Sequence, residues 1–62
     1  MNLQIWVKVP NEIADDPNML AVLDIAAQNM AAELGRTALP REVGPSDTPN
    51  NKVVCWALEG AK

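Results

Sequence analysis

Histidine, phenylalanine and tyrosine are absent from this sequence of 62 residues, and cysteine occurs only once. Without histidine, neither a serine nor a cysteine nucleophile has its usual general base, so Cys55 is expected to be a small apolar residue of the core. A single cysteine excludes a disulfide within the chain, and the missing histidine also removes the usual structural zinc site. The sequence therefore predicts no catalytic residue, no metal site and no cofactor.

Glycine is rare and scattered, so the chain has neither a P-loop nor a dinucleotide-binding fingerprint. No apolar run approaches the roughly 18 residues that a membrane span needs, and no basic segment precedes an apolar one as in a signal peptide. The lone cysteine, set in an apolar run, favours a reducing compartment. We therefore expect a cytoplasmic protein that contacts no membrane.

Charge of either sign is sparse and spread along the chain, with eight acidic and five basic residues and a net charge of −3. The sequence has no basic patch for phosphate groups and no dense acidic run that would imitate DNA. Only Trp6 and Trp56 could stack on bases. We expect no binding of nucleic acid.

What the sequence does contain is one strong helix, predicted over 17–34. Asp16 can cap this helix by accepting a hydrogen bond from its first turn, and Pro17 suits the first helical position. Gly35 can close the other end in the left-handed conformation. At helical spacing, one apolar stripe is predicted to face a sheet: Met19, Leu20, Leu23, Ala27, Met30 and Leu34.

The rest of the helix surface is mixed. Asp24 and Gln28 are predicted to mark an edge of the helix that faces water. Val22 and Ile25 fall on the outer side, among Asn18, Asn29 and Glu33. Because a solvated helix prefers polar residues there, we expect another surface to cover these two side chains.

A strand is predicted before the helix, over 3–9, because apolar and polar residues alternate until Pro10 stops the pattern. Trp6 is the exception on the polar face of this strand. It has two interpretations: it packs against a loop or strand of its own chain, or it anchors a contact with a subunit or partner, since tryptophan is enriched at interface hot spots.

A second strand is predicted over 52–59, and it is apolar on both faces, which is typical of a strand buried on both sides. The larger residues are expected to face the helix: Val54, Trp56 and Leu58. The smaller residues are expected to share the opposite face with Trp6: Val53, Cys55 and Ala57.

Residues 35–51 contain three prolines and are predicted to be mostly loop. A loop of this length in so small a domain is usually functional, disordered, or carries structure of its own. We expect a short extended piece over Leu39–Val43 to lie against the sheet. The segment Gly44–Asn51 is expected to be a mobile tip.

Two groups of charged residues have both a structural and a functional interpretation. Glu12, Asp15 and Asp16 precede the helix, where capping and the helix dipole favour negative charge, and their spacing does not match a calcium loop. Arg36 and Arg41 could grip an anionic ligand, but Arg36 directly follows the helix and suits the negative end of its dipole. We expect a structural role for both groups.

Together these elements predict one α/β domain over 1–62, a β-α-β unit whose helix packs on a two- or three-stranded sheet. The order strand, helix, strand favours parallel pairing of the two strands with a right-handed crossover. The loop before the second strand is long enough to reverse the chain, so antiparallel pairing is the alternative. A sheet of two strands alone is only marginally stable, and a core of this size contributes only about 3–5 kcal/mol of folding stability. We therefore expect a third segment or a second chain to complete the sheet.

In length and element order the chain resembles the tautomerase family, whose members assemble small β-α-β chains into oligomers. The catalytic residue of that family is an amino-terminal proline, exposed when the initiator methionine is removed. Here Met1 is followed by Asn2, and Pro10 has no free amine. The resemblance therefore implies an oligomer but transfers no catalytic residue.

The first functional hypothesis is a non-enzymatic protein-interaction module, a homodimer that also binds another protein, of the accessory or regulatory kind found in phage and mobile elements. The alternative is a small oligomeric enzyme or ligand-binding subunit whose site forms between chains, with Arg36, Arg41 and the acidic residues contributed across the interface. The candidate interface residues are apolar residues expected at the surface: Trp6, Val53, Cys55, Ala57, Val22 and Ile25.

Overall fold

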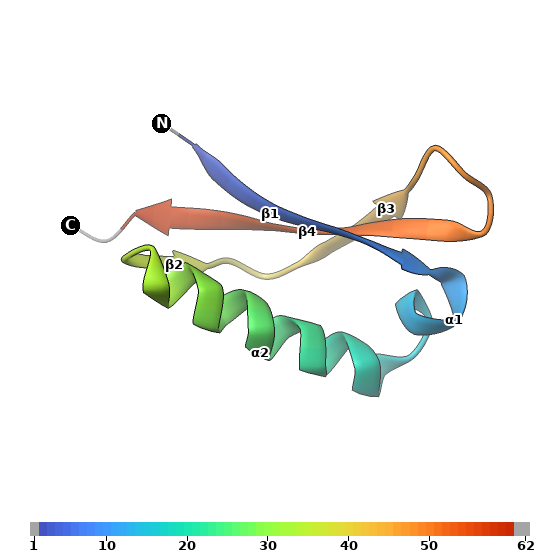
Figure 1. Cartoon of the computed structure of the whole chain (residues 1–62), viewed down its shortest axis with the longest axis horizontal. Helices are drawn as coiled ribbons and strands as arrows, with labels where there is room; N and C mark the ends of the chain where they lie inside the picture. The colour runs from blue at the N-terminus through green and yellow to red at the C-terminus, as the bar shows by residue number, and fades with distance from the viewer. Residues whose placement is uncertain (1, 61–62) are drawn as a thin grey trace.

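The computed structural model describes residues 2–60, which form one sheet and one long helix. In chain order the elements are β1 (Leu3–Pro10), α1 (Asn11–Ala14), α2 (Pro17–Glu33), β2 (Arg36–Ala38), β3 (Glu42–Pro45) and β4 (Asn51–Gly60). Figure 1 shows α2 running along one face of the twisted sheet, with the short α1 at one end. The long helix and the two long strands thus begin and end within a residue of their predicted limits.

The sheet is antiparallel throughout, with β4 at its centre. β1 pairs with β4 along one side, while β2 and β3 lie end to end along the other side. The parallel pair favoured for the two long strands is therefore wrong. After α2 the chain returns alongside β4 as β2 and β3, and the turn at 46–50 then reverses it into β4. The domain is mixed α/β, with one main helix on a four-stranded antiparallel sheet.

The segment expected to be mostly loop supplies the third part of the sheet. Its extended piece is longer than the predicted Leu39–Val43, because β2 and β3 pair on either side of a three-residue interruption. Within that interruption the Leu39 amide still donates to the Ala57 carbonyl at 2.9 Å. The predicted tip also shrinks, since Gly44 lies in β3 and the Ser46 hydroxyl donates to the Asn51 carbonyl at 2.9 Å.

Both ends of α2 are built as predicted. The Asp16 carboxylate accepts a hydrogen bond from the Asn18 amide at 2.9 Å, and Pro17 occupies the first helical position. Gly35 follows the helix with a φ of +70°, in the left-handed region that favours glycine. Asp15 lies 3.3 Å from the Lys52 ammonium, so the acidic residues before the helix serve its start and an ion pair to β4.

The core lies between α2 and β4. Val54, Trp56 and Leu58 are buried and face the helix, which confirms the predicted orientation of β4. Small residues let the helix approach the sheet closely, because Ala27 and Ala31 are both buried in this contact. The remaining buried residues are Val9, Ala14 and Leu20.

Three residues of the predicted core stripe are exposed instead: Met19, Met30 and Leu34. The helix packs closest to β2, to which only Leu34 and Gly35 connect it. This short connection holds the C-terminal end of α2 beside β2, and Figure 1 shows β1 on the far side of β4 there. The side of the helix that carries Met30 therefore has no strand directly above it.

Candidate interaction site

The face of the sheet opposite α2 carries four of the predicted interface residues. In the register of β1 with β4, Trp6 lies opposite Cys55, and its neighbours Gln4 and Lys8 lie opposite Ala57 and Val53. Successive side chains of a strand point to opposite faces, so these residues share the face turned away from the helix. We call this surface the open face, because no other element in residues 2–60 covers it. Its apolar residues are Trp6, Val53, Cys55 and Ala57.

Trp6 is the most prominent side chain of the open face, with 67% of its surface exposed. Its indole Nε1 donates to the Gln4 side-chain oxygen at 2.8 Å, which holds the ring along its own strand. The ring borders two adjoining shallow hollows, which share Pro45 and Val53. One, of about 240 Å³, is bounded by Gly44, Pro45 and Cys55, and the other, of about 460 Å³, includes Lys8. A partner that fills either hollow therefore contacts Trp6.

Charged side chains surround this apolar centre. The Lys8 ammonium lies 2.9 Å from the Asp47 carboxylate at the edge of the larger hollow. The hydrogen bond from Lys8, and then its positive charge, hold the pKa of Asp47 below the ordinary 3.8. Glu42 lies opposite Cys55 and Glu59 lies opposite Thr37, so both carboxylates are on the open face. The surface thus combines an apolar centre with a mainly acidic rim.

Cys55 is expected from the sequence to be a small apolar residue of the core and also a candidate interface residue, and it is not part of the buried core. It lies beside Trp6 on the open face and is only partly buried. The apolar residues of β4 predicted that both of its faces are covered, but within residues 2–60 only one of them is.

The other two predicted interface residues, Val22 and Ile25, lie on a different surface. Both are exposed on the outer side of α2, with the helix and the sheet between them and Trp6. The prediction that they face outward is correct, but no element among residues 2–60 covers them. The six predicted residues therefore form two separate surfaces.

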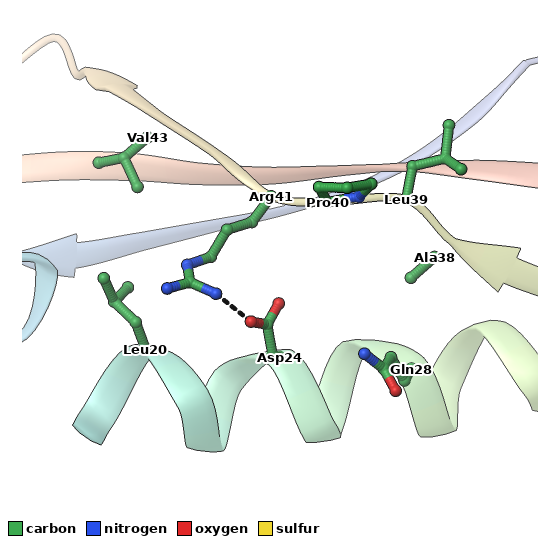
Figure 2. Close-up of a pocket in the computed structure, with 8 residues that line it drawn as sticks. All are labelled: Leu20, Asp24, Gln28, Ala38, Leu39, Pro40, Arg41 and Val43. Carbon is green, nitrogen blue, oxygen red and sulfur yellow. Dashed lines mark hydrogen bonds and ion pairs between the residues drawn. The ribbon is translucent and has the colours of Figure 1, made fainter. Parts of the chain in front are cut away.

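Asp24 takes a role that the sequence did not reveal. Its carboxylate turns toward the sheet, where one oxygen accepts a hydrogen bond from the Trp56 Nε1 at 2.6 Å and the other pairs with the Arg41 guanidinium. Figure 2 shows Arg41 reaching down to Asp24 from the interruption between β2 and β3. The sequence did contain a signal for this contact. A buried indole N–H needs an acceptor, and Asp24 is the acidic residue that borders the core stripe of the helix.

A cavity of about 480 Å³ lies between α2 and the β2–β3 edge, beside this network. Figure 2 shows its lining, in which Asp24 and Arg41 are already paired with each other. Arg36 lines a different hollow, with Gly60, so one chain does not bring the two arginines together as an anion grip. The alternative hypothesis of an anionic site between chains therefore gains no support from Arg41.

Within the described part of the chain, no group of three or more cysteine, aspartate or glutamate side chains is arranged to hold a metal ion. None of the helices described by the structure is both long enough and apolar enough to cross a membrane. Comparison of the chain with protein-family models, with curated protein sequences and with solved structures found no match.

Proposed function

We propose that this chain is a non-enzymatic protein-interaction module, which self-associates and which uses the open face to bind another protein. The observation that carries this proposal is Trp6, whose indole stands exposed at the centre of an uncovered sheet face. Large apolar patches with polar rims usually mark interaction sites, and tryptophan is the residue most enriched at their energetic centres.

The energy available at Trp6 is substantial. Because a tryptophan side chain carries about 150–250 Å², covering the 67% that Trp6 exposes contributes roughly 2–4 kcal/mol at about 25 cal/mol per Å². The Gln4 hydrogen bond already orients the ring, so less side-chain freedom is lost on binding. Trp6 therefore has the properties of a binding hot spot before any partner arrives.

The rim indicates the chemistry of the partner. Lys8 is already paired with Asp47, whereas Glu42 and Glu59 make no ion pair among the described residues. A complementary surface would place apolar side chains in the two hollows beside Trp6 and basic side chains near these carboxylates. The partner is thus a protein with an apolar projection and a basic rim.

The test begins with affinity capture from the native host, with the wild-type chain and Trp6→Ala compared side by side. A captured protein is then purified and titrated against both chains and against Gln28→Ala, a control on the opposite side of the molecule. We expect Trp6→Ala to weaken binding about tenfold or more and Gln28→Ala to leave it unchanged.

Fluorescence gives an independent measurement, because Trp6 is exposed and Trp56 is only 1% exposed. Binding should shift the wild-type emission to shorter wavelength, whereas Trp6→Phe, which retains only Trp56, should show no such shift. A purified partner that binds Trp6→Ala as tightly as the wild type would refute the open face as the binding site.

A further inference from the structure

The two edges of the sheet differ in how well they are protected. On the β2–β3 side the edge is broken into segments of three and four residues, with Pro40 in the gap and Pro45 at the end of β3. Short strands and prolines are common means of preventing further strand pairing. On the other side, β1 runs for eight residues and its only proline is the last one, Pro10.

The outer side of β1 therefore presents a continuous row of backbone groups. β1 pairs with β4 on one side, and nothing in residues 2–60 pairs with its other side. Such an edge is a template for another strand. The one charged side chain of β1, Lys8, points to the open face and pairs with Asp47, so it does not block the edge.

A row of exposed and half-buried apolar side chains lies beneath this edge. Asp24 and Gln28 line the cavity on the β2–β3 side of α2, so at about 100° per residue Met30 projects from the other side of the helix, toward β1. Met30 is 52% exposed, and on the helix-facing side of β1 only Val9 is buried, whereas Leu3, Ile5 and Val7 are partly exposed. We call this surface the β1 groove: Leu3, Ile5, Val7, Met19, Met30 and Leu34.

We propose that a second copy of the chain occupies the β1 edge and the β1 groove, with the two β1 strands paired antiparallel about a two-fold axis. This inference rests on the self-association proposed above and adds where it occurs. The axis is perpendicular to the sheet, so the two sheets become one and both helices lie on the same face. The two copies of α2 then run antiparallel, which also opposes their dipoles favourably.

A second copy suits this surface better than an extended peptide does. A peptide strand would satisfy the backbone groups of β1 but would leave Met19, Met30 and Leu34 in water. A second copy brings both an identical edge and an identical apolar row, and two-fold symmetry places each opposite its counterpart. The surface is thus complementary to itself.

The size of the surface suits a weak dimer. The paired stretch 3–9 is about 24 Å long at about 3.4 Å per residue, and the sheet and helix layers together are about 20 Å deep, which gives about 480 Å² per copy. The total of about 960 Å² is below the roughly 1,200 Å² at which stable interfaces begin, and it is typical of weak, transient contacts. The protomer is also extended for its length, with a Cα radius of gyration of 11.9 Å against about 10.6 Å for a compact domain.

The alternation of β1 restricts the register. Residues directly opposite in an antiparallel pair share a face, so a shift by one residue would move the apolar residues of one strand onto the open face of the other. Centring the pair on Trp6 aligns the whole stretch 3–9, with Gln4 opposite Lys8 of the second copy and Ile5 opposite Val7 of the second copy. Both Trp6 side chains then lie side by side in the middle of one enlarged open face.

The first test compares Met30→Glu with Gln28→Glu by analytical ultracentrifugation at micromolar concentrations. Both variants add one negative charge at an exposed position of α2, but only Met30 lies in the β1 groove. We expect the wild type to be a dimer, Met30→Glu to raise its dissociation constant about tenfold or more, and Gln28→Glu to leave it unchanged. Circular dichroism establishes that both variants remain folded.

The second test traps the register in a Cys55→Ala background. Gln4→Cys combined with Lys8→Cys should give a disulfide-linked dimer on mild oxidation, because opposite Cα atoms about 4.5–5.5 Å apart are within disulfide range. Gln4→Cys alone should not, since the two copies of that position would be about 14 Å apart.

Each other outcome has a definite meaning. A dimer that Met30→Glu leaves intact and Trp6→Ala dissociates would show pairing through the open face, which overturns the β1 interface but keeps self-association. Equal crosslinking of the single and double cysteine variants would overturn the register. A wild-type chain that stays monomeric while it binds a partner through Trp6 would overturn self-association and this inference, and would keep the open face.

Discussion

Asp24 offers the sharpest test of how this small core is stabilised. Its carboxylate is the acceptor for the buried Trp56 N–H at 2.6 Å, and its other oxygen pairs with Arg41. Replacement by alanine removes both interactions, whereas Asp24→Asn retains an oxygen that can accept from Trp56. The two variants therefore separate the hydrogen bond from the ion pair.

The magnitudes differ because the two interactions differ in burial. An unsatisfied buried donor costs about 1–3 kcal/mol. The Arg41 side chain is 31% exposed, and that of Asp24 is 25% exposed, so water screens their pair, and we assign it only about 0.2–1 kcal/mol. Asp24→Ala should then cost about 1–4 kcal/mol, a large part of the roughly 3–5 kcal/mol that a core of this size supplies. Asp24→Asn should cost about 1 kcal/mol or less.

The assay is urea unfolding in a Trp6→Phe background, in which fluorescence reports on Trp56 alone. Arg41→Ala is the matched control for the ion pair, and its cost should resemble that of Asp24→Asn. If Asp24→Ala unfolds within about 0.5 kcal/mol of its parent, the Trp56 N–H has another acceptor and the reasoning is refuted.

Two further predictions concern the helix and the charged rim. Leu20→Ala should cost about 2–5 kcal/mol, and Leu23→Ala less, because Leu20 is buried and Leu23 only partly so; equal melting temperatures for the two variants would contradict this assignment. Lys8→Ala should return the pKa of Asp47 toward 3.8, measured by NMR titration of the carboxyl carbon. Since the folded pKa is lowered, the stabilisation from this pair is present above pH 3.8 and is lost as pH falls through the folded value.

Much of the fold could be predicted from the sequence, because its determinants are local. The alternation of apolar and polar residues determines β1. The ends of α2 are determined by residues directly beside them: Asp16, Pro17 and Gly35. β2 and β3 have no such local pattern, since prolines interrupt them and their extended form comes from pairing with β4. The antiparallel direction of β4 follows from that return path, which strand order alone does not determine.

The open face could also be predicted. β4 is apolar on both faces, and the alternation of side chains along β1 places Trp6 on the same face as the smaller residues of β4, Val53, Cys55 and Ala57. The β1 groove and the Asp24 network could not. Periodicity identifies which side of a helix faces a sheet, but it does not give the position of the helix across the strands. Here the two-residue connection to β2 sets that position, exposes Met30 and brings Asp24 to Trp56.

One strand connects the two surfaces. The even positions Gln4, Trp6 and Lys8 point to the open face, and the odd positions Leu3, Ile5 and Val7 point to the β1 groove. In the proposed dimer, pairing of the two β1 strands doubles the open face, so a partner that touches both copies of Trp6 binds the dimer more tightly than the monomer. By linkage, that partner tightens the dimer by the same factor. An interface of about 1,000 Å² suits this coupling, because it gives a weak dimer. The monomer is then populated, and binding of the partner can shift the monomer–dimer equilibrium toward the dimer.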